Sequence, residues 1–76
     1  MPINNDRNRA LVALRDRPQG IPSRELAGSL GLPLDDIERH LRYCTDYALA
    51  TWNKKDGTGP AMITDRGRDY LTRQGL

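Results

Sequence analysis

Few side chains in this sequence have the types and spacing that catalysis needs. The 76 residues include one cysteine, Cys44, and one histidine, His40. One cysteine cannot form an internal disulfide, and these two side chains alone cannot complete the four-ligand shell of a zinc site. No Ser/His/Asp grouping, glycine-rich phosphate loop or carboxylate pair with a plausible cleft occurs. We therefore predict no catalytic residues, no metal site and no cofactor, and we do not expect an enzyme.

The charged side chains, which make up 29% of the chain, carry the remaining chemistry. Twelve Lys and Arg against ten Asp and Glu leave a formal charge of +2, which permits binding to a polyanion without demanding it. Eight side chains expected on exposed helix turns or at a hairpin tip are candidate contact residues: Arg24, Asp35, Asp36, Arg39, Arg42, Lys54, Lys55 and Arg66. A chain of this length buries only roughly 60 to 65% of its unfolded surface, so we expect one domain over residues 1–76.

Residues 21–49 must position most of these candidates, and they have the pattern of two short helices joined by a tight turn. Ser23 is expected to cap the first helix through its side-chain oxygen. Gly31 suits a left-handed helix end, and Pro33 holds Leu32 extended, so the turn is three residues long. In the second helix an apolar stripe recurs at spacings of three and four residues: Leu34, Ile37, Leu41 and Cys44.

Two further helices are expected at the ends of the chain. The first begins at a cap among residues 4–6 and runs to about residue 17, with Ala10, Leu11 and Leu14 on its buried stripe. The last follows a cap at Thr64 and runs over residues 65 to about 74. Its few apolar residues lie near its end, so it is expected to close over the base of a hairpin.

A hairpin is predicted between the third and fourth helices, with Ile21 as a short extended segment beside it. Asp56-Gly57 is the dipeptide that most readily gives two central turn residues with positive φ. That turn fixes the register, with the pairs Ala50–Ile63, Thr51–Met62, Trp52–Ala61 and Lys55–Thr58. Trp52 then lies on the covered face, where small Ala61 leaves room for the indole.

Two strings of the sequence resemble a known superfamily. SRELAGSLGLPLDDIERHLRYC, residues 23–44, is similar to the S-x-E-L-A-x-x-L-G-L-S-x-x-x-V-x-R-H-L-x-x-L pattern of MarR- and ArsR-type winged helix-turn-helix domains. The matching positions are Leu26, Ala27, Leu30, Gly31, Ile37, Arg39, His40 and Leu41. ITDRGRDYL, residues 63–71, is similar to the hairpin exit L-T-x-x-G-R-x-Y-L of the same domains. The two strings are separated here by a hairpin with a basic tip.

The resemblance implies an α+β, mainly helical winged helix-turn-helix fold with a three-helix core, a β-hairpin wing and a C-terminal helix. It also implies a transcriptional regulator that binds double-stranded DNA. The helix beginning at residue 34 would enter the major groove, with Arg39, Arg42 and one of the two aspartates at base edges. The wing would meet phosphates through Lys54 and Lys55, helped by side chains outside that helix, Arg24 and Arg66.

Each candidate also has a purely structural explanation, and the sequence leaves both open. Asp35 and Asp36 fall in a first helical turn, where carboxylates stabilise the helix dipole by about 0.3 to 1 kcal/mol, or they accept from a cytosine amino group. Arg39 and Arg42 contact DNA or pair with neighbouring acids along the helix. The lysines at the hairpin tip contact phosphates or only increase solubility.

The charge of the presumed recognition helix suggests an alternative function. Four acids against two arginines between residues 34 and 47 give a net charge of −2, which would repel a duplex and attract a cationic protein. The alternative is therefore a winged-helix adaptor that binds a protein partner through this acidic face. No stretch is long and apolar enough for a signal peptide or a membrane span, so we expect a cytoplasmic protein, monomeric in solution and able to pair on DNA.

Overall fold

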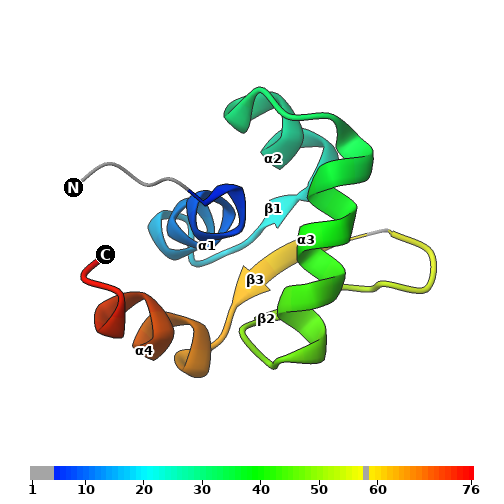
Figure 1. Cartoon of the computed structure of the whole chain (residues 1–76). Helices are drawn as coiled ribbons and strands as arrows, with labels where there is room; N and C mark the ends of the chain where they lie inside the picture. The colour runs from blue at the N-terminus through cyan, green and yellow to red at the C-terminus, as the bar shows by residue number, and fades with distance from the viewer. Residues whose placement is uncertain (1–4, 58) are drawn as a thin grey trace.

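The computed structural model describes residues 5–57 and 59–76, and in this part of the chain it is an α+β, mainly helical domain (Figure 1). The elements are α1 (Asp6–Asp16), β1 (Ile21–Pro22), α2 (Ser23–Leu30), α3 (Leu34–Asp46), β2 (Ala50–Thr51), β3 (Pro60–Ile63) and α4 (Asp65–Arg73). The predicted order of helices, extended segment and hairpin is confirmed. Figure 1 shows the short sheet between α1 and α3, with α4 at the opposite end from α2.

The three strands form one antiparallel sheet in the order β1-β3-β2. The predicted pairs Ala50–Ile63 and Thr51–Met62 are confirmed. The register of these pairs puts Trp52 next to Ala61, as predicted, but the ladder between β2 and β3 ends at Thr51–Met62. β1 lies on the other side of β3, with Pro22 opposite Pro60 and Ile21 opposite Ala61. The predicted face is also confirmed, because Trp52 is only 7% exposed.

The predicted two-residue turn at Asp56-Gly57 is wrong. Gly57 has φ +69, but Asp56 does not have positive φ, and the strands end well before the turn. Asn53 instead organises the loop: its backbone carbonyl accepts from Gly57 N–H at 2.8 Å and its side chain accepts from Lys55 N–H at 3.3 Å. These local hydrogen bonds replace the ladder that a tight turn would need. The predicted Lys55–Thr58 pair lies outside the described residues.

Helices α1 and α4 are capped by side chains, whereas α2 and α3 are not. Asn5 Oδ1 accepts from the amides of Arg7 and Asn8, and Thr64 Oγ1 accepts from that of Gly67, as predicted. The predicted Ser23 cap is wrong, because extended Pro22 occupies the cap position and Ser23 is the first, buried residue of α2. Pro33 occupies the same position before α3, also without a side-chain cap.

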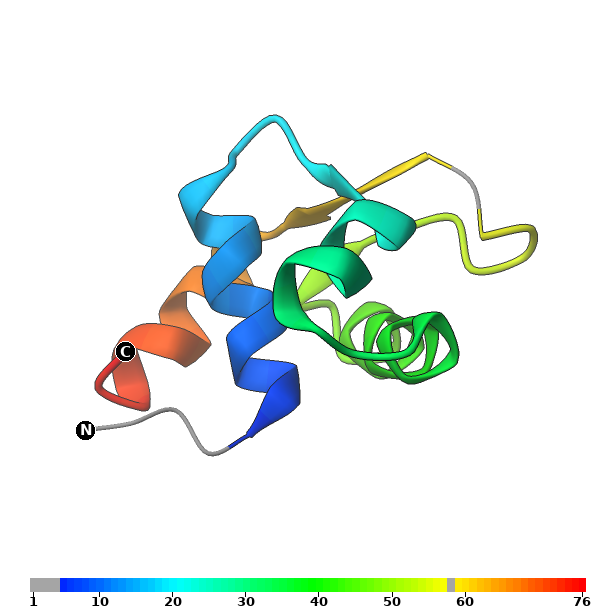
Figure 2. The ribbon, with the colours of Figure 1, turned by 90° about the horizontal axis from the view of Figure 1, so that it is seen from above.

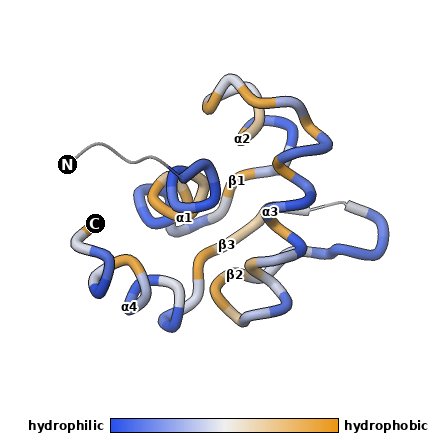
Figure 3. The backbone as a smooth tube through the Cα atoms, viewed as in Figure 1, coloured by the Kyte–Doolittle hydropathy of each residue, from blue (hydrophilic) through white to orange (hydrophobic). Residues whose placement is uncertain are grey.

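One apolar cluster fills the space enclosed by the helices and the sheet. Figure 3 shows its hydrophobic segments turned inward from α1, α3 and β3, and the loop after β2 as hydrophilic. The most deeply buried large side chains are Leu11, Leu14, Leu26, Ile37, Leu41, Leu71 and Cys44. Leu34 was expected on the buried stripe of its helix but is only half-buried at the edge of the cluster, as is Leu30. Gly31 has φ +68 and ends α2 in the predicted left-handed conformation.

Candidate functional site

Helix α2, helix α3 and the described loop residues 52–57 lie on one side of the molecule, away from α4. Figures 1 and 2 both show this loop projecting beyond the sheet beside α3. The pairing of Pro22 with Pro60 brings the start of α2 to the base of the same loop. We call the exposed side chains Arg24, Asp35, Arg39, Arg42, Lys54 and Lys55 on these elements the α3–loop face.

The loop is held along one flank of α3. Lys54 Nζ forms an ion pair with the Asp46 carboxylate in the last turn of α3. Glu38, about two helical turns before Asp46, also lies close to the loop. A Cβ placed on Gly57 would be only 3.0 Å from Glu38 Oε2. Glu38, Arg42 and Asp46 follow one another at intervals of four residues and therefore share one stripe of the helix. Because the loop reaches the first and last of these residues, Arg42 lies beside it.

Ion pairs engage two of the four carboxylates of α3. Arg39 Nη2 lies 3.2 Å from Asp36 Oδ1 along the helix, and Lys54 pairs with Asp46 from the loop. The side chain of Arg39 is still 75% exposed, so the pair is screened by solvent and contributes little to stability. The acidic character of α3 is consequently reduced where its own arginine and the loop lysine reach it.

Three cations of the α3–loop face have no ion pair among the described residues. Arg24 lies in the first turn of α2, Arg42 in the middle of α3 and Lys55 in the loop, and all three are exposed. By contrast, Arg39 forms an ion pair with Asp36, and Lys54 forms one with Asp46. Three elements that are separate in the sequence thus each contribute to this side of the molecule one exposed cation without an ion pair among the described residues.

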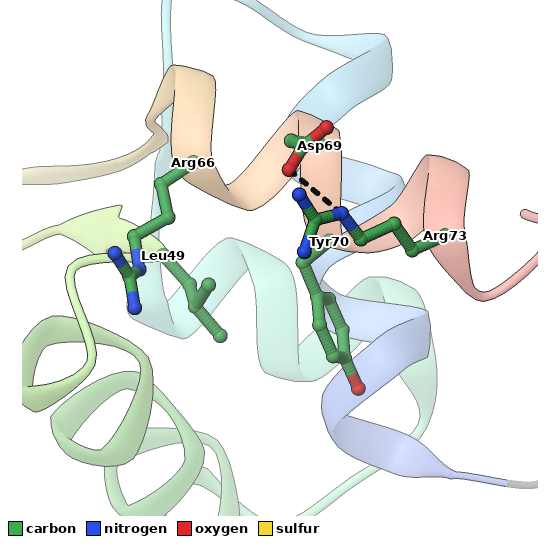
Figure 4. Close-up of a pocket in the computed structure, with 5 residues that line it drawn as sticks. All are labelled: Leu49, Arg66, Asp69, Tyr70 and Arg73. Carbon is green, nitrogen blue, oxygen red and sulfur yellow. Dashed lines mark ion pairs between the residues drawn. The ribbon is translucent and has the colours of Figure 1, made fainter.

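Two predicted site residues do not belong to the α3–loop face: Asp36, which is half-buried on α3, and Arg66, which the structure places elsewhere. Arg66 lies near the start of α4 and lines an open pocket of about 250 Å³ with Leu49, Asp69, Tyr70 and Arg73 (Figure 4). Arg73 Nε is 3.1 Å from Asp69 Oδ2 there. Because α4 lies at the opposite end of the molecule from the loop (Figure 1), Arg66 does not join the α3–loop face.

Sequence reasoning missed a stack of side chains between α1 and α3. The guanidinium carbon of Arg7 lies 3.5 Å from the centre of the Tyr43 ring, and the rings of Tyr43 and Tyr47 have centres 4.5 Å apart. Arg7 is half-buried in this stack. The spacing of four between the two tyrosines was a readable signal of ring contact.

The surroundings of Cys44 and His40 do not favour a role as nucleophile or metal ligand for Cys44, or a charged ring for His40. Burial raises the pKa of the Cys44 thiol to about 11, so the thiolate that would act as a nucleophile or a metal ligand is scarce at neutral pH. Burial, and then the Arg7 charge, lower the pKa of His40, which favours the neutral ring. Within the described ranges no three His, Cys, Asp or Glu side chains come together to hold a metal ion.

No helix in the part of the chain that the structure describes is long and apolar enough to cross a membrane. Comparison of the chain with protein-family models, with curated proteins and with solved structures found no match.

Proposed function

We propose that this chain is a winged-helix domain that binds double-stranded DNA as a small transcriptional regulator. In this proposal α3 enters the major groove and the loop of residues 53–59 lies against the phosphate backbone. The observation that supports it most is the set of unpaired cations on the α3–loop face, because neutralising phosphates is the main source of affinity for DNA. An exposed α-helix also has the width that the major groove admits.

The order of the elements supports the same proposal. A helix, a short strand, two helices joined by three residues, a hairpin and a last helix follow one another in this chain. This is the order that the resemblance to winged helix-turn-helix domains implies. In that arrangement the second of the joined helices reads bases and the first touches the backbone.

Different side chains of the face would have different roles. Arg42 is exposed on α3 and has no ion pair with any described residue, so it is the candidate for bidentate contact with a guanine. Lys55 in the loop and Arg24 in the first turn of α2 would contact phosphates. Because Pro22 at the cap position of α2 provides no side-chain cap, the amides of the first turn of α2 can also donate to a phosphate.

A titration of the whole chain with a mixed-sequence duplex, repeated at several salt concentrations, tests this function. We expect a complex at low salt whose affinity falls as salt rises, because bound phosphates release their counterions. Absence of a complex at low salt, or an affinity that does not depend on salt, would contradict DNA binding. A protein that co-purifies with the chain and binds Asp35 and Glu38 would instead favour the adaptor function.

Lys55→Ala is expected to weaken binding almost equally on all duplexes and to reduce the salt dependence by about one phosphate contact. Lys55 is exposed and makes no ion pair among the described residues, so its removal should leave the melting temperature nearly unchanged. Arg66→Ala is the matched control, since it removes the same charge from the far end of the molecule. Equal losses for the two variants would show that only net charge matters.

Arg42→Ala is expected to lose about 1 to 3 kcal/mol of binding free energy on a preferred site and much less on random DNA. The preferred site is first obtained by selection from random duplexes. Arg42→Lys keeps the positive charge but lacks the planar guanidinium that makes bidentate contacts. It should therefore restore the affinity for random DNA without restoring the preference for the selected site. If Arg42→Ala loses equally on both kinds of duplex, Arg42 contacts the backbone and not a base.

A further inference from the structure

The stack of Arg7, Tyr43 and Tyr47 has an open end. The guanidinium of Arg7 lies over one face of the Tyr43 ring at 3.5 Å. The Tyr47 ring has its centre 4.5 Å from that of Tyr43, and the two planes are tilted by 36°. These short distances leave no room for both neighbours on the same face, so Tyr43 is sandwiched between the arginine and the second tyrosine. Tyr47 therefore ends the stack.

The two tyrosines are unusually exposed for aromatic side chains. Tyr43 is 37% exposed and Tyr47 is 56% exposed, and together they are half of the one tryptophan and three tyrosines of the chain. More than half of Tyr47 is therefore accessible to a partner. Exposed tyrosines are enriched at sites where proteins bind one another, because one rigid ring offers a large contact area.

The surroundings of Tyr47 favour a positive charge. Tyr47 is the C-cap residue of α3, at the negative end of the helix dipole, and the last turn of α3 contains no basic residue. The neighbouring Asp46 adds a carboxylate, although Lys54 reaches it from the loop. An aromatic ring face also attracts cations, and Arg7 shows that this stack already holds a guanidinium on its inner end.

We propose that the open face of Tyr47 is a docking site for an arginine side chain on a cationic segment of a partner protein. The incoming guanidinium would continue the stack, in the same relation to Tyr47 as Arg7 has to Tyr43. Arginine is preferred over lysine because its planar guanidinium stacks on a ring and is more weakly hydrated. The negative C-terminal end of α3, which has no basic residue in its last turn, attracts the guanidinium.

This site is separate from the proposed DNA contacts. Tyr43 and Tyr47 share the flank of α3 that faces α1, since Tyr43 packs against Arg7 of that helix. Glu38, Arg42 and Asp46 occupy the flank that faces the loop. The docking proposal therefore does not depend on DNA binding, and Tyr47→Ala is expected to leave the affinity for duplex DNA unchanged.

The test is a nuclear magnetic resonance titration of the whole isotope-labelled chain with the peptide Gly-Arg-Gly-Arg-Gly. We expect shifts of the Tyr47 ring signals, and upfield ring-current shifts of the arginine side chain of the peptide. The same peptide with lysine in place of arginine should bind more weakly, and the peptide with glutamine should not bind. Tyr47→Ala should weaken arginine-peptide binding about two- to fivefold.

Two control variants separate ring stacking from general attraction. Tyr47→Phe keeps the ring and should retain most of the binding, and Met62→Ala changes an exposed apolar residue on the sheet and should have no effect. Equal binding of the arginine and lysine peptides, unchanged binding by Tyr47→Ala, or shifts confined to Asp35 and Glu38 would overturn the proposal. So would concentration-dependent Tyr47 shifts without peptide, which would indicate a second copy of the chain.

Discussion

Trp52→Ala is expected to lower the free energy of unfolding by about 3 to 5 kcal/mol. The Trp52 side chain is only 7% exposed, and it lies on the covered face with Ala50, Ala61 and Ile63. Its ring also supports the loop, since a Cβ on Gly57 would lie 3.6 Å from Trp52 Cζ2. A loss of this size is a large part of the total stability of a small domain. Urea denaturation followed by circular dichroism measures it.

Trp52→Phe distinguishes loss of volume from loss of a polar group. The indole N–H of Trp52 is buried and has no hydrogen-bond partner among the described residues, which is unfavourable in a folded protein. Phenylalanine removes this unpaired donor and keeps part of the ring volume, so it should cost clearly less than alanine. Met62→Ala, on the exposed face, should cost less than about 1 kcal/mol. If Trp52→Ala were no worse than Met62→Ala, the described packing of Trp52 would be wrong.

Gly67→Ala is the second substitution with a large expected effect, about 3 kcal/mol or more of lost stability. Helix α4 passes so close to the end of the α3–β2 connection that a Cβ on Gly67 would lie 2.1 Å from the backbone oxygen of Leu49. It would also lie 2.7 Å from Ile63 Cγ1. Because a backbone carbonyl cannot rotate away as a side chain does, α4 has to move off the hairpin. Thermal denaturation should show a strongly reduced melting temperature.

Gly28→Ala is the matched control for this substitution. Gly28 also lies inside a helix, but a Cβ there meets nothing within 4 Å. Alanine has the higher helix propensity, so Gly28→Ala should stabilise the fold by roughly 0.5 to 1 kcal/mol. Opposite signs for the two variants would show that close packing of α4, and not glycine flexibility, requires Gly67. Destabilisation of similar size at both positions would contradict this explanation.

The sequence predicted those parts of the fold that depend on periodicity. Spacings of three and four placed Ile37, Leu41 and Cys44 on the buried side of α3, and all three are buried. Alternation along the hairpin placed Trp52 on the covered face. The predicted Asp56-Gly57 turn was wrong because local hydrogen bonds to Asn53 organise the loop instead. Such competition between neighbouring polar groups has no signature in a hydrophobic pattern.

For the candidate site, the sequence identified charged residues but not their partners. It placed Arg42 and Lys55 on exposed positions, where the structure also has them. It did not predict that Lys54 reaches Asp46 across the loop, because that contact depends on the loop path. Arg66 was grouped with the other cations from the resemblance alone, whereas packing of α4 carries it to another part of the surface. The contact of Arg7 with Tyr43 could not be predicted, because it depends on how α1 packs against α3.

The facing prolines at the end of the sheet have a consequence for self-association. Pro22 lies opposite Pro60, and neither residue has an amide hydrogen with which to extend the ladder. The outer strands β1 and β2 are each only two residues long. Short edges interrupted by proline are poor templates for an incoming strand. The loop and α3 can therefore be exposed to a partner while the sheet edges remain unsuited to pairing with the sheet of another copy of the chain.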